Sequence, residues 1–204
     1  MMNPFLILVH SARQAWRNYY HTLLISALWL AAQLLVITGP PATAVLFAMA
    51  QNTHEGAFWN AGNLWHAFRE LFVPAWIWAM PNILVAAGLA LGPVSDWWGR
   101  SGVALAGLRV AWVALAALWL GLNLFYWPSW LGAVEPSLRA GYAGSIRFWR
   151  QSPIIAFYVF LVTLLVAAVS LPFMLPFVLG VAFWIALVAE TAVHHGRREF
   201  EQSG

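Results

Sequence analysis

The sequence predicts an all-α fold: a polytopic membrane helix bundle with six membrane segments and two interfacial amphipathic helices. Composition is the first reason, because 62% of the 204 residues are hydrophobic and the mean hydropathy is +0.73. Charge is the second, because the chain has ten basic and seven acidic residues where a soluble domain of this length would have roughly 50 charged residues. A small soluble domain cannot bury so many apolar side chains, because much of its surface stays in contact with water. These values exclude a soluble globular domain, a disordered chain and a disulfide scaffold.

Four long uncharged stretches are the third reason, and they give the number of crossings. They run over 18–54, 71–95, 110–134 and 151–189, with lengths of 37, 25, 25 and 39 residues. A helix needs about 20 residues to cross a hydrocarbon core about 30 Å thick. The two middle stretches therefore each predict one crossing. The outer two are too long for a single helix, so each predicts a hairpin.

Each outer stretch carries two prolines where a reversal is needed: Pro40 and Pro41 in the first, Pro172 and Pro176 in the last. The chain then forms a single membrane domain over 1–204. Its predicted membrane segments are 20–38, 41–53, 73–92, 108–127, 154–171 and 175–193. The second segment is about 20 Å long by helical rise, which is short of a full span. Its hairpin is therefore either re-entrant or tilted against a thinned bilayer.

The distribution of arginine gives an independent test of six crossings. With the N-terminus in the cytoplasm, six segments place eight of the ten arginines inside and leave Arg100 and Arg109 outside. Five segments would place only four arginines inside. Because short cytoplasmic loops carry an excess of positive charge, we expect six segments with both termini cytoplasmic. The stretch 194–198, which contains two of the arginines, is expected to be a solvated tail attracted to anionic lipid.

Two further stretches have the pattern of helices that lie in a membrane interface. In 63–72 the apolar side chains share one helical face and the polar side chains share the other. That apolar face consists of Leu64, Trp65, Phe68, Leu71 and Phe72. The second stretch sets Leu138, Tyr142, Ile146 and Trp149 against Arg139, Arg147 and Arg150. Each stretch is followed by a proline and then by a predicted membrane segment.

The most distinctive motif is the turn Gly39-Pro40-Pro41-Ala42-Thr43 in the first hairpin. Gly39 can take the left-handed conformation that ends one helix, and proline suits the first turn of the next. One interpretation is a ligand site, in which a half-helix N-terminus faces a bound molecule near the middle of the membrane. The other is a tight turn in which Thr43 bonds a carbonyl of the preceding turn, and this simpler interpretation is preferred.

The same motif carries a resemblance to a known family. The order of a first membrane helix, the stretch 39–47 (GPPATAVLF) and then Trp65-His66-Ala67-Phe68-Arg69 resembles the YesL-like family of bacterial integral membrane proteins, a domain of unknown function. The family pattern resembles G-x-x-P-A-T-A-A before apolar residues. Here proline comes two positions after Gly39, and Val45 replaces the final alanine. The resemblance implies a polytopic protein encoded beside genes for carbohydrate uptake and breakdown, and it implies no catalytic residue.

Ionisable residues at membrane depth are candidate functional residues by default. Glu190 lies one turn inside the end of the last predicted segment. It is either an acid or base in a functional site or an interface residue paired with His194, four positions on. Arg109 begins the fourth segment, and its guanidinium can reach outward to the interface. Polar amide side chains within the segments either line a polar path or hydrogen-bond helices together. These are Gln33, Asn82 and Asn123.

Several chemistries are excluded by residue types that the chain lacks. It has no cysteine, which excludes a thiolate metal site, a catalytic thiol and a disulfide, and no lysine, which excludes a Walker A loop and a Schiff base. Its six histidines include no pair four residues apart, so no metal site is predicted. No cofactor is predicted and no catalytic residue is assigned. The arginines flank apolar runs, so we expect no binding to nucleic acid.

We therefore expect a non-enzymatic, transport-associated or accessory protein of the bacterial plasma (inner) membrane, linked to carbohydrate uptake by the resemblance. Its partners are the lipid bilayer and either further copies of itself or a larger permease complex. The reason is that six segments in a 22.7 kDa chain leave little room for a translocation path of its own. Two alternatives are a membrane enzyme acting on lipid or glycan, with Glu190 as acid or base, and a non-catalytic assembly or sensing scaffold.

Overall fold

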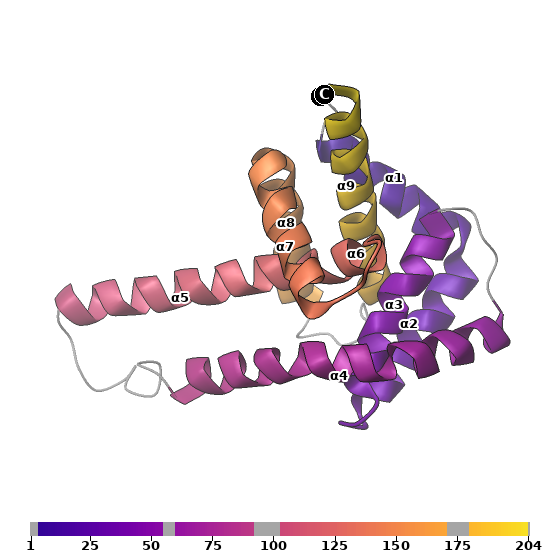
Figure 1. The fold of residues 1–204 in the computed structure, drawn as a ribbon, viewed down its shortest axis with the longest axis horizontal. Helices are drawn as coiled ribbons and strands as arrows, with labels where there is room; N and C mark the ends of the chain where they lie inside the picture. The colour runs from indigo at the N-terminus through magenta and orange to yellow at the C-terminus, as the bar shows by residue number, and fades with distance from the viewer. Residues whose placement is uncertain (1–3, 55–59, 92–102, 171–179, 204) are drawn as a thin grey trace.

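The computed structural model describes residues 4–54, 60–91, 103–170 and 180–203, and every regular element in that part of the chain is helical. The first helices are α1 (Pro4–Arg17), α2 (Tyr19–Gln33) and α3 (Gly39–His54). The next are α4 (Ala61–Leu91), α5 (Val103–Leu124) and α6 (Tyr126–Leu131). The last are α7 (Leu138–Gln151), α8 (Pro153–Ser170) and α9 (Ala182–Ser203) (Figure 1). The all-α class predicted from the sequence is confirmed.

Three stretches of helix are long and apolar enough to cross a membrane. They cover Gly62–Ala90, Ala106–Leu131 and Pro153–Ser170. They correspond to the predicted segments 73–92, 108–127 and 154–171. By contrast, α2 and α3 have only 15 and 16 residues, so at about 1.5 Å per residue neither reaches straight across about 30 Å of hydrocarbon. Spanning length and composition are thus confirmed for three of the segments, and six crossings are not confirmed.

The predicted interfacial stretch 63–72 does not form a helix of its own. It is continuous with the third predicted segment in α4, which runs without interruption through Pro74 and Pro81. The predicted division of its faces is confirmed except at Trp65, which is 62% exposed, because Leu71 is buried while four polar side chains are exposed. These are Asn63, His66, Arg69 and Glu70. The second predicted interfacial helix is a separate element, α7. It begins at Leu138 and is capped by Ser137, whose Oγ accepts a hydrogen bond from the Ala140 N–H at 3.1 Å.

The last predicted segment, 175–193, is only partly covered by the described residues, since 171–179, with Pro172 and Pro176, lies outside them. Its described part belongs to α9, which continues to Ser203. Gly196 is buried there, and a Cβ at this position would lie 2.8 Å from Cε2 of Phe148 on α7. The prediction of a solvated tail over 194–198 is therefore wrong at Gly196, because the backbone packs against the protein.

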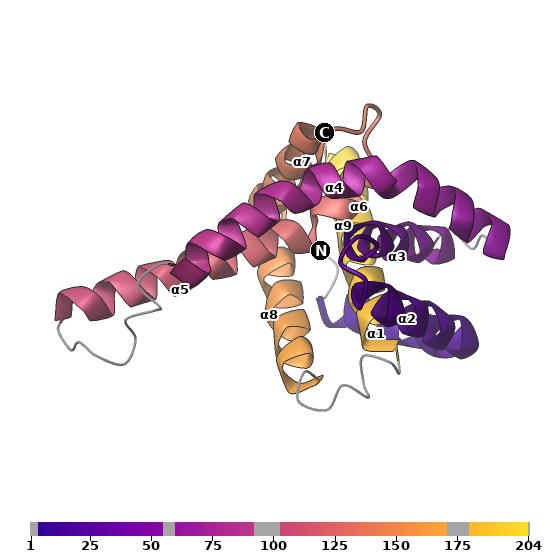
Figure 2. The ribbon, with the colours of Figure 1, turned by 90° about the horizontal axis from the view of Figure 1, so that it is seen from below.

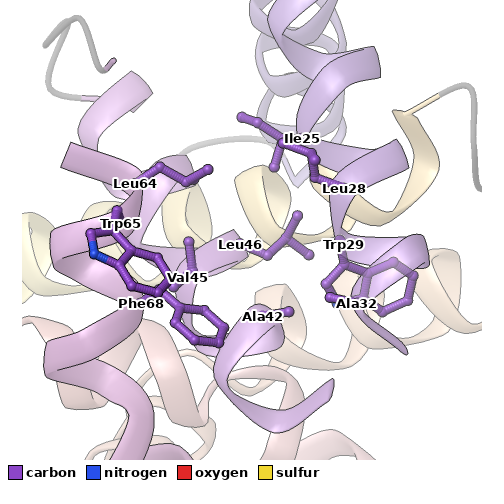
Figure 3. A pocket seen from close by; sticks show the side chains of 10 residues that line it. All are labelled: Ile25, Leu28, Trp29, Ala32, Ala42, Val45, Leu46, Leu64, Trp65 and Phe68. Atoms are coloured by element: carbon purple, nitrogen blue, oxygen red, sulfur yellow. The ribbon is translucent and has the colours of Figure 1, made fainter. Parts of the chain in front are cut away.

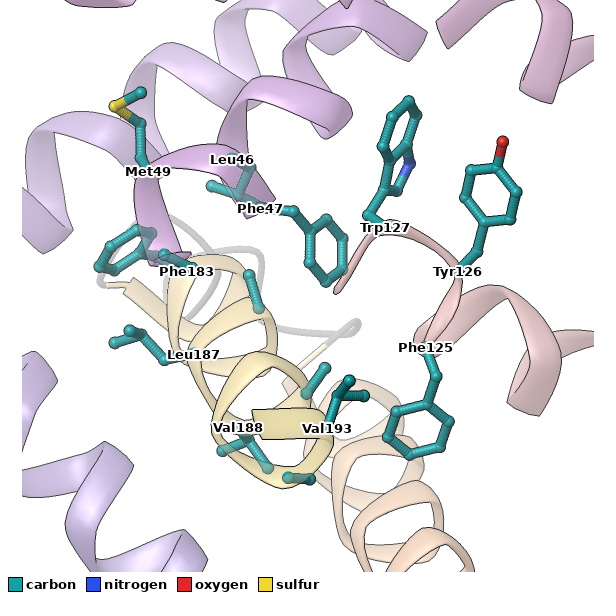
Figure 4. Packing of buried hydrophobic residues seen from close by; sticks show 14 of the residues in the cluster. Leu46, Phe47, Met49, Phe125, Tyr126, Trp127, Phe183, Leu187, Val188 and Val193 are labelled. Atoms are coloured by element: carbon teal, nitrogen blue, oxygen red, sulfur yellow. The ribbon is translucent and has the colours of Figure 1, made fainter. Parts of the chain in front are cut away.

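The core is centred on α3 and α9. Every residue of α9 from Ala186 to Val193 is buried, and α9 contacts α1, α2, α3, α6, α7 and α8. Figure 4 shows Phe47 of α3 beside Trp127 of α6, with Phe183 and Leu187 of α9 on the other side. A helix that is apolar all round is buried in the interior of a protein or in lipid. In this chain, other helices of the protein cover much of α3 and α9.

α4 and α5 run antiparallel and project together from the rest of the molecule (Figures 1 and 2). They expose large apolar side chains along this projection; Leu84 and Val110 are each 69% exposed. In both views α8 and α9 run across the direction of this pair. The three long apolar helices are therefore not arranged as a parallel bundle.

α1 is an amphipathic helix that the sequence analysis did not predict. Two of its side chains, Ile7 and Ser11, are fully buried. The Ser11 hydroxyl donates to the Thr191 hydroxyl on α9 at 3.2 Å, and Thr191 in turn donates to the Leu187 carbonyl at 2.7 Å. The N-terminal helix thus belongs to the packed core in addition to carrying Arg13 and Arg17.

Candidate functional site

The proline turn joins α2 to α3, and Gly39 is the first residue of α3. Pro40 and Pro41 occupy the first turn, where their missing N–H groups cost no helical hydrogen bond, as predicted. The left-handed conformation expected for Gly39 is wrong, because in the described part of the chain the glycine with positive φ is Gly180, at 109°. Gly39 is needed for space instead: a Cβ there would lie 2.8 Å from Oε1 of Gln33.

Thr43 is the centre of a small hydrogen-bond network at this turn. Its Oγ1 accepts from Nε1 of Trp29 at 3.1 Å and from Nε2 of Gln33 at 3.0 Å. The same hydroxyl donates to the Gly39 carbonyl at 3.1 Å, which Gln33 also reaches at 3.2 Å. Thr43 therefore bonds a carbonyl of the preceding turn, as the tight-turn interpretation predicts. Thr43 at the start of α3 is thus bonded by side chains of α2, which favours that interpretation over a ligand site at the helix N-terminus.

Replacing Thr43 by valine is expected to lower the free energy of unfolding by about 1 to 3 kcal/mol. Valine has nearly the same shape, but it leaves the Trp29 and Gln33 donors without this acceptor. The measurement is thermal unfolding of the purified protein in a mild detergent. Thr43→Ser is the matched control, because serine keeps the hydroxyl and should retain most of the stability. An equal loss in both variants would show that packing of the methyl group matters and the network does not.

An apolar cavity of about 310 Å³ lies beside the turn, between α2, α3 and α4 (Figure 3). It is lined by Ile25, Leu28, Trp29, Ala32, Ala42, Val45, Leu46, Leu64, Trp65 and Phe68. Ala42 belongs to the predicted motif, and Leu64, Trp65 and Phe68 belong to the predicted apolar face of 63–72. The cavity therefore brings together two stretches that the sequence singled out separately. Its chemistry suits an apolar chain or ring, because the side chains that line it are hydrophobic apart from the indole N–H groups of Trp29 and Trp65.

Glu190 lies in the packed core of the protein. Its side chain is only 6% exposed, on the stretch of α9 that packs against α1 and α3. Nearby polar groups of this junction come from three helices. Gln14 of α1 donates to the Thr53 carbonyl at 2.6 Å, and the His54 ring at the end of α3 lies 4.8 Å from the His194 ring, between ring centres. Glu190 lies four residues before His194, so the two side chains occupy neighbouring positions on the surface of α9.

The other charged candidate, Arg109, lies within α5, six residues after its first residue, Val103, and is half-buried. The structure places it on α5, in the projecting α4–α5 pair, whereas Glu190 belongs to α9, which runs across that pair (Figure 1). The sequence-predicted charges therefore do not form one site. Among the described residues, no three side chains of histidine, aspartate or glutamate come together as a metal ion would require.

Asn82 and Asn123 form a reciprocal clasp with two tryptophans between α4 and α5. The Trp78 indole N–H donates to Asn123 Oδ1 at 2.9 Å, and the Trp119 indole N–H donates to Asn82 Oδ1 at 2.9 Å. Each asparagine also donates to the carbonyl of the tryptophan four residues before it, at 2.7 Å for Asn82 and 2.8 Å for Asn123. Of the two interpretations for these asparagines, the hydrogen bonds favour joining helices over lining a polar path.

Tyr142 of α7 connects this clasp to the rest of the molecule. Its hydroxyl donates to Asn123 Oδ1 at 3.3 Å, and its ring lies 4.8 Å from the Tyr126 ring and 5.5 Å from the Trp119 ring, between ring centres. Burial raises the pKa of the Tyr142 hydroxyl, and the nearby Asn82 and Asn123 side chains oppose part of that rise. The hydroxyl therefore stays protonated at neutral pH and keeps its role as a donor.

Comparison of the chain with family models, with curated proteins and with solved structures finds no match. The family resemblance of the turn motif therefore stays a prediction.

Proposed function

We propose that this chain is an integral protein of the bacterial plasma membrane that works as an accessory component of solute transport, linked to carbohydrate uptake. In this proposal the six segments predicted from the sequence enter the membrane, and both termini lie in the cytoplasm. The resemblance of the 39–43 motif to YesL-like proteins supplies the link to carbohydrate. The arginine distribution supplies the orientation.

The observation that carries the accessory role is the chemistry of the cavity beside the proline turn. A site for a sugar needs polar groups that meet the hydroxyls of the sugar, because each unmatched hydrogen bond is costly in a buried site. The cavity is lined by apolar side chains, and the polar groups of Thr43 and Gln33 at the neighbouring turn bond each other. This supports a role beside a permease rather than as the sugar carrier itself.

The apolar surface of the three long helices supports docking on a membrane partner. In their most apolar stretches only 17%, 11% and 22% of the residues are buried inside the chain. In a bilayer such surface contacts either lipid tails or other membrane helices, and helices associate there through close packing and hydrogen bonds. The proposed partners are a second copy of the chain or a larger permease.

A deletion strain tests the proposed role. We expect uptake of at least one carbohydrate to fall in a screen across carbon sources and to recover when the wild-type chain is restored. Crosslinking in native membranes should trap a dimer or a complex with a permease. Unchanged uptake on every carbon source, together with crosslinking that yields monomer alone, would contradict the proposal.

Reporter fusions test the orientation separately. A reporter at the N-terminus and one after Phe200 are expected on the same, cytoplasmic face of the membrane. Reporters on opposite faces would exclude an even number of crossings. They would also exclude the cytoplasmic placement of most arginines, on which the orientation depends.

A membrane enzyme acting on lipid or glycan is a second candidate, favoured by one observation: the burial of Glu190 in the core, one helical turn before His194 on α9. This candidate predicts that Glu190→Gln, which keeps the shape of the side chain and removes its charge, abolishes the function of the strain while the protein still accumulates and folds. Thr191→Val is the neighbouring control for packing, since Thr191 is buried on the same helix. A strain that carries Glu190→Gln and behaves as the wild type would remove the enzyme hypothesis.

A further inference from the structure

The cationic face of α7 borders two adjoining cavities that the proposed function does not use. One, of about 480 Å³, lies between the 129–135 stretch, α7 and Val193 of α9, and has Glu135 in its lining. The other, of about 530 Å³, is lined by Ala143, Ile146, Arg147, Arg150 and Gln151 of α7. The two share Ala143, Arg147 and Gln151, so they adjoin one another along the helix, but Glu135 lines the first and not the second.

The second cavity concentrates positive charge without a compensating acid. Arg147 and Arg150 are three residues apart on α7, so their Cβ atoms lie about 5 to 6 Å apart on neighbouring positions of the helix surface. Gln151 adds an amide donor beside them. No acidic residue lines this cavity, and no ion pair joins either arginine to another residue in the described part of the chain. Two guanidinium groups with an amide are a donor set that matches the oxygens of a phosphate group.

The position of these donors along the chain matches the depth of lipid headgroups. α7 ends at Gln151, and α8, one of the three stretches long and apolar enough to span a membrane, begins at Pro153. Arg150 is three residues before that start, or about 5 Å along a helix. The headgroup region adds about 5 to 7 Å on each side of the hydrocarbon core. If α8 spans, its adjoining arginines lie at the level of the lipid phosphates.

We propose that the second cavity, the hollow bordered by Arg147, Arg150 and Gln151, binds the phosphate of an anionic phospholipid headgroup. The fold keeps α7 in place for this role. Gly144 allows α7 to approach α6 closely, since a Cβ there would lie 2.7 Å from the Ser129 Cβ, and Trp149 on the inner face donates to the Gly121 carbonyl at 3.3 Å. This inference is independent of the transport role, because it concerns a lipid site that any function of the chain would share.

Lipid binding to the purified full-length chain tests the site. The probes are phosphatidylglycerol and phosphatidylcholine, titrated separately into detergent-solubilised protein and counted by native mass spectrometry. We expect tighter binding of phosphatidylglycerol by the wild type. Arg147→Gln and Arg150→Gln are each expected to weaken that binding about fivefold, the effect of one arginine near a lipid surface. Arg147→Lys keeps the charge and should recover part of the loss.

Arg139→Gln is the matched control, because Arg139 is also exposed on α7 but lines neither cavity. It removes the same charge, and it should leave the affinity for phosphatidylglycerol close to that of the wild type. Equal weakening by Arg139→Gln would show diffuse attraction and overturn the site. Equal binding of the two lipids would also overturn it, and displacement of the lipid by millimolar inorganic phosphate would assign the hollow to free phosphate instead.

Discussion

Gly141→Val is expected to destabilise the folded chain by about 3 kcal/mol, the upper end of the usual cost of overpacking. A Cβ at this position of α7 would overlap the ring of Tyr126, with two ring carbons at 2.8 Å. The ring cannot move aside, because Tyr126 is 1% exposed and its ring packs against those of Tyr142, Trp127 and Trp78. We expect a clearly lower midpoint of thermal unfolding in a mild detergent.

Two other glycines provide the control for this prediction. Gly88 in α4 and Gly107 in α5 are also helical, but nothing lies within 4 Å of a Cβ built at either position. Valine has a slightly better helix propensity than glycine, so Gly88→Val and Gly107→Val should be neutral or slightly stabilising. If Gly141→Val were as stable as these two variants, α7 could not pack on Tyr126 as closely as described.

Asn123→Leu is expected to lower the free energy of unfolding by about 1 to 2 kcal/mol, and Asn82→Leu is expected to lower it by about half as much. The difference follows from the number of donors that each amide oxygen accepts. Asn123 Oδ1 accepts from both Trp78 and Tyr142, whereas the hydrogen bond to Asn82 Oδ1 comes from Trp119. Thermal unfolding of both variants checks the order, and a larger loss for Asn82→Leu would contradict it.

A double-mutant cycle isolates one bond of the clasp. Trp119→Phe removes the indole N–H that donates to Asn82. The double variant with Asn82→Leu should therefore lose less free energy of unfolding than the sum of the losses in the two single variants. The matched cycle pairs Trp119→Phe with Asn123→Leu. Asn123 bonds the Trp119 backbone carbonyl rather than its indole, so these two changes should be nearly additive. Additivity in both cycles would exclude the side-chain bond between Trp119 and Asn82.

The sequence predicts most of what depends on local pattern. Pro40 and Pro41 open α3 as expected, Pro153 opens α8, and the polar and apolar faces of 63–72 separate as the periodicity indicates. These features follow from the chemistry of a few neighbouring residues, which the sequence displays directly. The membrane class follows from composition in the same way.

The sequence does not show which apolar surfaces pack against other helices of the chain and which are left exposed. α3 and α9 form the core although the pattern predicted membrane segments there, because an all-round apolar helix looks the same in either setting. The burial of Glu190 and the packing of α1 on α9 depend on those long-range contacts. The clasp did leave a signal that was overlooked: tryptophan precedes asparagine by four positions at both Trp78–Asn82 and Trp119–Asn123.

That repeated spacing limits how α4 and α5 can slide along one another. Because each helix supplies one indole donor and one amide acceptor, both cross-links close only when the helices stand at a single relative height. A shift by one turn, about 5.4 Å, would break both at once. The two tryptophans and two asparagines therefore hold α4 and α5 at one relative height. Any motion of this projection must move the two helices together.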